Sequence, residues 1–194
     1  YRDPVTPSAP AILASRMFRV NVSKMSMKQD FEAAIERLLQ RLWGSDTKIG
    51  QLKRLSGGAS QETWSISVDQ TGKSIPVILR RAPGGAAPNS DSSAIGLAAE
   101  ARLIAMASDN SVPVPGVIHV LDTKDDLGAG FLMNRIEGET LARPILRDDT
   151  FKTARERLTS QCGEALAQIH KIAPPDDGFL PLSTGLMQLE KYEE

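Results

Sequence analysis

Hydrophobic side chains change their spacing several times along the chain, and each spacing predicts a type of element. Residues 30–43, DFEAAIERLLQRLW, repeat apolar positions three and four residues apart, which predicts a helix that ends at Gly44. Residues 48–55 and 61–68 are predicted to be strands. In the second of these, Trp, Ile and Val alternate with Thr and Ser, the pattern of a half-buried strand.

The same criteria predict five later elements. A third strand covers 74–81 after the turn DQTGK, and three strands joined by short turns favour an antiparallel meander. The others are a helix at about 94–107, strands at 117–122 and 130–136, and a helix at about 149–172 that the following prolines end. The order helix, three strands, helix, two strands, long helix predicts an α+β fold.

Composition and charge narrow the class of protein. The 194 residues are 41% hydrophobic and 24% charged, which suits one or two soluble globular domains. A net charge of −1 argues against nucleic-acid or anionic-membrane partners, and no apolar run approaches the ~20 residues that span a bilayer. Cys162 is the one cysteine, so we expect a reducing cytoplasm. The Pro- and Ser-rich residues 1–28 are predicted to be a disordered or added segment.

Small residues interrupt the first two strands at Gly57, Gly58, Ala59 and Ser60. Residues without bulky side chains let a ligand approach backbone N–H groups closely, and the Ser60 hydroxyl adds a donor. A tight hairpin turn needs glycine for a different reason, its conformational freedom. The four residues alone therefore leave a phosphate-binding loop and an ordinary turn both open.

The third strand ends in two arginines, Arg80 and Arg81. Alternation along a strand directs them to opposite faces, and one should share a face with Ile78, under the glycine turn. A buried guanidinium requires an anion, which can be a carboxylate or a ligand phosphate. The alternative is a strand end that frays into solvent.

A carboxylate, Glu100, falls within the apolar face that Leu97 and Ile104 define on the predicted helix. Because an unpaired carboxylate is costly among apolar side chains, Glu100 could pair with Arg80 across a helix–sheet interface. It could also lie at the flank of the helix and reach water. Arg102, two residues further, points elsewhere on the helix and is a poor partner.

The segment FLMNRIEGET, residues 131–140, passes from a buried strand into a polar connection. Its free backbone groups could hydrogen-bond a flat heterocycle, or it could be a plain linker. His119 and His170 are isolated, and no metal-ligand spacing involves either one. Cys162 lies on the apolar stripe of its helix, so we expect a small core residue.

Six stretches, in order, resemble the aminoglycoside phosphotransferase (APH) family, which has a protein-kinase-like fold. They are LSGGASQETWSI, VILRRAP, EARLIAMA, VPVPGVIHV, FLMNRIEGETL and EALAQIH, within residues 29–172. The branch they resemble includes kinase-like domains attached to acyl-CoA dehydrogenases. The resemblance implies a small lobe at 29–137, with a five-stranded antiparallel sheet, one packed helix and a preceding helix. Residues 138–194 would then hold the hinge and the first helix of a large lobe.

The resemblance also implies roles for matched residues. The turn Gly57–Ser60 would cover the ATP phosphates, and Arg80 would hold the α- and β-phosphates where many kinases use lysine. Glu100 would orient that cation. Met133 would border the adenine, and the backbone from Asn134 to Ile136 would hydrogen-bond the base.

The catalytic half of such a kinase is expected to be missing from this chain. In the family it comes from an HGD…N loop and a later aspartate that bind Mg²⁺ and the acceptor, and neither histidine here precedes Gly-Asp. The expected function is the ATP-binding lobe of a kinase that phosphorylates a hydroxyl of a metabolite or antibiotic, inactive as this fragment. The branch leans toward a hydroxyacyl-CoA or related metabolite. The alternatives are a pseudokinase-like binding module and an interaction domain without nucleotide.

Overall fold

The computed structural model describes residues 27–55, 61–87, 95–175 and 177–180. Its centre is a five-stranded antiparallel sheet with the strand order β1-β2-β3-β5-β4. The strands are β1 (Lys48–Leu55), β2 (Glu62–Gln70), β3 (Lys73–Arg81), β4 (Val117–Val120) and β5 (Gly130–Asn134). The predicted α+β class with a five-stranded antiparallel sheet is confirmed.

Residues 27–43 are helical and precede the sheet, so residues 27 and 28 belong to this helix and not to the predicted N-terminal segment. The later helices are α2 (Leu97–Asp109), α3 (Ala142–Arg147) and α4 (Lys152–Ile169), with 3₁₀ turns at Pro83–Gly85, Thr123–Asp125 and Asp149–Phe151. The sequence pattern did not predict α3, because six residues that include a proline are too short to show helical periodicity.

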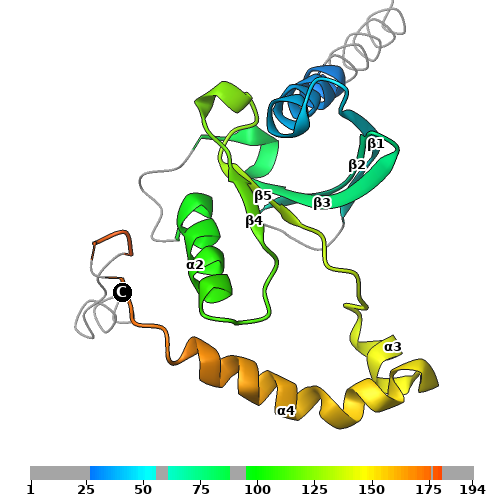
Figure 1. Cartoon of the computed structure of the whole chain (residues 1–194), viewed down its shortest axis with the longest axis vertical. Helices are drawn as coiled ribbons and strands as arrows, with labels where there is room; N and C mark the ends of the chain where they lie inside the picture. The colour runs from blue at the N-terminus through cyan, green and yellow to red at the C-terminus, as the bar shows by residue number, and fades with distance from the viewer. Residues whose placement is uncertain (1–26, 56–60, 88–94, 176, 181–194) are drawn as a thin grey trace, which may run out of the picture.

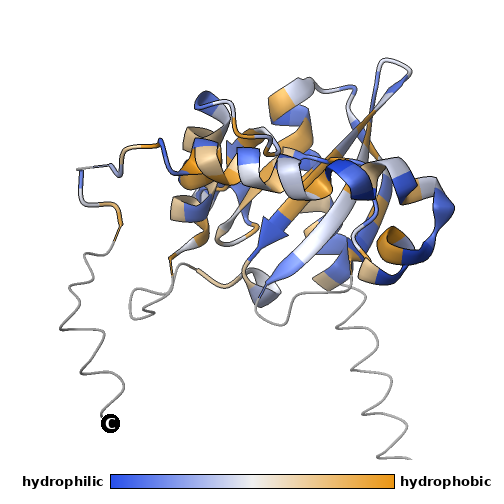
Figure 2. Ribbon diagram, turned by 90° about the horizontal axis from the view of Figure 1, so that it is seen from below, coloured by the Kyte–Doolittle hydropathy of each residue, from blue (hydrophilic) through white to orange (hydrophobic). Residues whose placement is uncertain are grey.

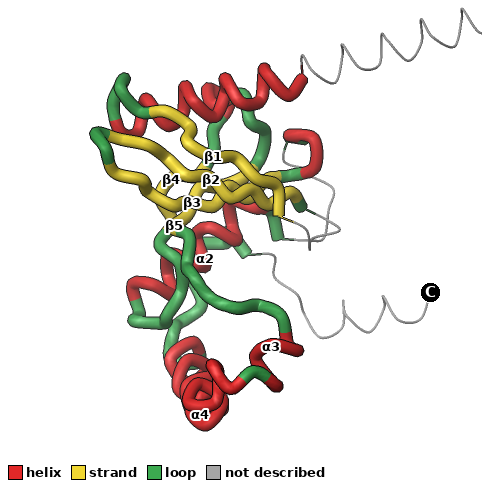
Figure 3. The backbone as a smooth tube through the Cα atoms, turned by 90° about the vertical axis from the view of Figure 1, so that its right-hand side faces the viewer, coloured by secondary structure: helices red, strands yellow, loops and turns green. Residues whose placement is uncertain are grey.

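The sheet lies between two helical layers (Figure 3). The N-terminal helix packs its buried side chains Ile35, Leu38 and Leu39 against one face. The strands supply alternate apolar residues to the same cluster, among them Ile66, Val68, Val77, Leu79 and Leu132. This cluster is the main core of the described chain, and the strand period of two is what gathers its members on one face.

The opposite face holds a smaller core under α2. Leu97 and Ala101 of α2 pack on Phe131 of β5, with Val117 and Met133 beside them. Helix α2 therefore covers the β4–β5 half of this face (Figure 1). Among the described elements, none packs on the β1–β3 half of the face in the way that α2 packs on β4 and β5.

A buried carboxylate, Asp125, ties the N-terminal helix to the turn between β4 and β5. Its side chain accepts hydrogen bonds from the Asp122 backbone N–H (2.8 Å), from His119 Nε2 (2.9 Å) and from Arg41. Burial acts to raise the pKa of Asp125, but these hydrogen bonds and the Arg41 charge hold it below its ordinary value. His119 thus has a structural contact.

We expect the domain to lose stability as the pH falls through about 4. The pKa of Asp125 is lower in the folded state, so the unfolded chain binds a proton first and acid favours unfolding. Urea unfolding midpoints between about pH 7 and 3 measure the effect. The variant Asp125→Asn should show a shallower decline below about pH 4, and equal slopes for the two proteins would contradict the assignment.

Helix α4 lies apart from the sheet, beyond α2 (Figure 1). Hydrophobic and polar residues mix along it (Figure 2), and Leu158, Leu166 and Ile169 are 45–51% exposed. The prediction that Cys162 is a core residue is wrong: its side chain is exposed, because its stripe on α4 has no packed layer over it among the described residues. In the described residues, no helix is long and apolar enough to cross a membrane.

Candidate functional site

The two arginines at the end of β3 lie on opposite faces of the sheet, as strand alternation predicted. Arg80 is in register with Thr63 of β2 and Phe131 of β5, and Phe131 carries the α2 core. Arg81 is in register with Glu62 and Gly130 and lies on the face of the N-terminal helix. Arg80 and Arg81 are therefore adjacent in the strand, but their side chains lie on opposite faces and have different surroundings.

Arg80 pairs with Glu100 of α2, at 3.1 Å between Nη1 and Oε1. The side chains are 37% and 26% exposed, so the pair is partly open to solvent. Glu100 reaches Arg80 because α2 docks through Leu97 and Ala101 on Phe131, the cross-strand neighbour of Arg80. Gln61 accepts a further hydrogen bond from Arg80 Nε. The ion pair expected from the sequence is confirmed.

Arg81 pairs with Glu62, and this pair is largely shielded from solvent. The Arg81 Nη2–Glu62 Oε2 distance is 2.9 Å, and both side chains are about nine-tenths buried. Arg81 also donates to the Leu127 carbonyl (3.3 Å), and its guanidinium carbon lies 3.9 Å from the ring centroid of Phe31 in the N-terminal helix. The Gly84 N–H donates to Glu62 Oε1 (3.3 Å).

Burial acts to raise the pKa of Glu62, but the Gly84 and Arg81 hydrogen bonds and the Arg81 charge hold that pKa below its ordinary value. Sequence reasoning missed this partner. Counting the same number of residues away from the two-residue turn at 71–72 along each strand would have placed Glu62 opposite Arg81. Because Arg81 is buried and each of its guanidinium nitrogens bonds a protein group, it is a structural residue, and Arg80 is the arginine of the two that remains partly open.

The connector after β5 begins beside the open half of the sheet. Met133 packs at the edge of the α2 core, next to Phe131. The backbone N–H of Asn134 donates to the Gly116 carbonyl (2.9 Å), and that of Arg135 donates to the Pro76 carbonyl (3.3 Å). Ile136 is exposed, and no residue in the described ranges hydrogen-bonds its backbone N–H. Of the three backbone N–H groups in the predicted base-binding segment, that of Ile136 is the one without a partner among the described residues.

The turn Gly57–Ser60 lies outside the described residues. No group of three or more His, Cys, Asp or Glu side chains in the described part of the chain could hold a metal ion.

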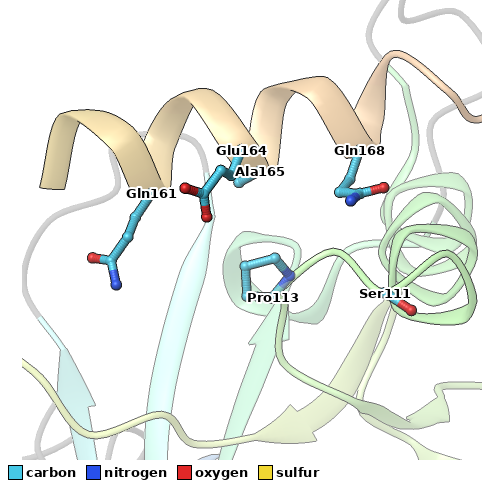
Figure 4. A pocket seen from close by; sticks show the side chains of 6 residues that line it. All are labelled: Ser111, Pro113, Gln161, Glu164, Ala165 and Gln168. Atoms are coloured by element: carbon cyan, nitrogen blue, oxygen red, sulfur yellow. The ribbon is translucent and has the colours of Figure 1, made fainter. Parts of the chain in front are cut away.

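Two hollows lie away from Arg80. One, of about 500 Å³, separates α4 from the loop after α2 and is lined by Pro113, Gln161, Glu164 and Gln168 among others (Figure 4). The other, of about 290 Å³, lies between the 3₁₀ turn after β3 and the β4–β5 turn. Neither of these two hollows is lined by Arg80, Glu100 or Ile136.

The described chain has an antiparallel five-stranded sheet, a cation at a strand end and a carboxylate on the packed helix, and a connector leads on to further helices. Together these features define a kinase-like α+β domain. The sequence profile of the phosphotransferase enzyme family (APH) matches residues 51–193. The chain belongs to this phosphotransferase family. The assignment agrees with the resemblance found in the six sequence stretches.

A solved structure of a thermostable mutant of the aminoglycoside phosphotransferase APH(4)-Ia, in a ternary complex with AMP-PNP and hygromycin B, is similar to this chain. The two are 20% identical, the TM-score is 0.44, and the match covers 72% of this chain. The match spans about 40% of the length of the solved chain. A search of the curated proteins finds no match.

Proposed function

We propose that residues 29–137 form the nucleotide-binding lobe of a small-molecule kinase and that residues 138–194 hold the hinge and the start of a second lobe. The full protein would transfer the γ-phosphoryl group of ATP to a hydroxyl of a metabolite or antibiotic. The observation that carries the proposal is the partly exposed Arg80–Glu100 pair beside an open sheet face. Membership of a phosphotransferase family supports the reaction class.

Arg80 has the donors that a phosphate needs. A guanidinium has five N–H groups, and Gln61 and Glu100 occupy the Nε group and one position on Nη1. The remaining donors are free to form charge-assisted bonds to the α- and β-phosphates. Glu100 compensates the charge and limits the rotamers of Arg80, so the cation is positioned before nucleotide arrives.

The other proposed contacts follow from the neighbouring elements. The unused N–H of Ile136 is the donor we assign to the edge of the adenine, with Met133 at its border. The turn Gly57–Ser60 connects β1 to β2 and would supply backbone N–H groups above the phosphates. Mg²⁺, which would neutralise phosphate charge during transfer, would be held by carboxylates of the second lobe.

The alternative is a pseudokinase-like module that binds nucleotide or a partner without transfer. Phosphate release from ATP with candidate hydroxyl acceptors, measured on the full-length protein, separates the two. Nucleotide binding without transfer would favour the module.

The direct test is ATP binding. We expect the full-length protein to melt at a higher temperature with ATP and Mg²⁺, since a ligand present at about 100 times its Kd stabilises by about 2.7 kcal/mol. Isothermal titration should give one nucleotide site. Unchanged melting and no heat of binding would contradict the proposed function.

A further inference from the structure

Arg135 is the first residue beyond β5, and its side chain crosses the open half of the sheet. Asn134 is in register with Val77, and the Arg135 N–H bonds the carbonyl of Pro76, the next residue of β3. Arg135 Nη1 donates to Ser65 Oγ on β2 (3.0 Å). To reach β2 from the end of β5, the side chain must pass over β3 on the face that carries Ile78.

This face is the one that carries Arg80. Ser65, Ile78 and Met133 form one row across β2, β3 and β5, and Thr63, Arg80 and Phe131 form the next row. Same-face neighbours along a strand are about 7 Å apart. The guanidinium of Arg135 is therefore about one row from Arg80, beside the N–H assigned to the base.

Each nitrogen of this guanidinium has a protein partner. Glu137 binds it through two oxygens, with Arg135 Nε 3.0 Å from Oε1 and Nη2 donating to Oε2 at 3.0 Å. Ser65 takes Nη1, and the Ser65 residue is itself 8% exposed. These bonds hold the guanidinium plane in place and leave its flat faces without a ring partner among the described residues. The side chain is 36% exposed, so part of the group is accessible.

A flat cation that is held in place through its nitrogens can bind another flat, electron-rich group through its face. Guanidinium planes stack on aromatic rings through cation–π attraction and contact area, which an ammonium cannot reproduce. Ile78 and Met133 offer an apolar row next to it, and Ile136 offers a donor one residue further along the chain. A purine fits this combination.

We propose that Arg135 is a base-stacking residue, whose guanidinium plane forms one wall of the site for the nucleotide base. The proposal rests on the proposed nucleotide-binding function and adds a residue to it. Because every base has a flat face, stacking tolerates different purines. Arg135 should therefore strengthen binding of ATP and GTP alike and contribute nothing to a bare polyphosphate chain.

Titration of the full-length protein with ATP, GTP and inorganic tripolyphosphate tests this. Arg135→Lys, which keeps the charge and loses the plane, should weaken ATP and GTP about 5- to 30-fold. The Kd for tripolyphosphate should change by less than about twofold. Arg135→Gln should weaken both nucleotides at least as much. Arg157→Lys, an exposed arginine on α4, is the matched control and should change nothing.

The possible results distinguish a failure of the stacking role from a failure of the proposed nucleotide-binding function. No ATP binding by the wild-type protein contradicts the proposed function itself. ATP binding that Arg80→Ala removes but Arg135→Lys leaves unchanged overturns the stacking role alone. Tighter ATP binding by Arg135→Lys would show that the guanidinium blocks the base, and an equal loss for tripolyphosphate would place Arg135 at the phosphates. Unchanged melting of both variants without nucleotide confirms that they fold.

Discussion

Replacement of Arg80 by alanine should remove most ATP binding while leaving the fold intact. The guanidinium is 37% exposed and its partner Glu100 is 26% exposed, so water can solvate the carboxylate that the substitution leaves unpaired. Charge-assisted hydrogen bonds contribute about 1.5–3 kcal/mol each, so the Kd for ATP should rise about 10- to 150-fold. Titration calorimetry and ATP-dependent melting of the full-length protein measure this change.

Two further substitutions test whether the planar shape of Arg80 and its pairing with Glu100 contribute to ATP affinity. Arg80→Lys keeps the charge without the planar fork and should recover only part of the affinity. Glu100→Gln leaves Arg80 in place but without its charged partner, and we expect a smaller loss. Arg157→Ala, on exposed α4, is the control. Wild-type affinity in Arg80→Ala would exclude this cation from the nucleotide site.

Replacement of Glu62 by alanine should cost the domain about 3–5 kcal/mol of unfolding free energy, the range for removing one partner of a buried ion pair. Arg81 is 11% exposed and would be left charged beneath the N-terminal helix, against Phe31. The Gly84 N–H would lose its acceptor as well. Urea unfolding followed by circular dichroism gives the difference directly.

The contrast with an exposed pair makes this prediction specific. Lys28 and Glu32 form an i,i+4 pair at 3.6 Å on the N-terminal helix, with side chains 73% and 41% exposed. Glu32→Ala should change stability by less than about 0.5 kcal/mol. The double variant Glu62→Leu/Arg81→Met removes both buried charges and should recover much of the loss. If Glu62→Ala costs no more than Glu32→Ala, the buried pair is not a stability determinant.

Local pattern in the sequence accounted for most of the elements. Helical spacing located the N-terminal helix and α4, and alternation located β2, because each signal depends only on neighbours within a few residues. The partnership of Arg80 with Glu100 was also predictable, since a strand-end cation and a carboxylate on an apolar helix face each require a counter-charge. Helix boundaries shifted by up to three residues, as with α2, which begins at Leu97 after Gly96.

Contacts between distant parts of the chain could not be read in the same way. Arg135 meets Ser65 across 70 residues of sequence, and Arg41 meets Asp125 across 84. Neither pairing leaves a periodic signal, because it depends on which strand edges and helix faces come together. The same holds for Cys162, whose stripe on α4 looks like a core face but is exposed among the described residues.

The sequence by itself determined the α+β class, the five strands, the family and the pairing of Arg80 with Glu100. The tertiary structure alone decided that β5 inserts between β3 and β4, which brings the connector beside the face of Arg80. It also decided that Arg81 is buried against Glu62 while Arg80 stays open. The physical reason is that side-chain period is a local property, whereas burial and partnership depend on the packing of surfaces far apart in the chain.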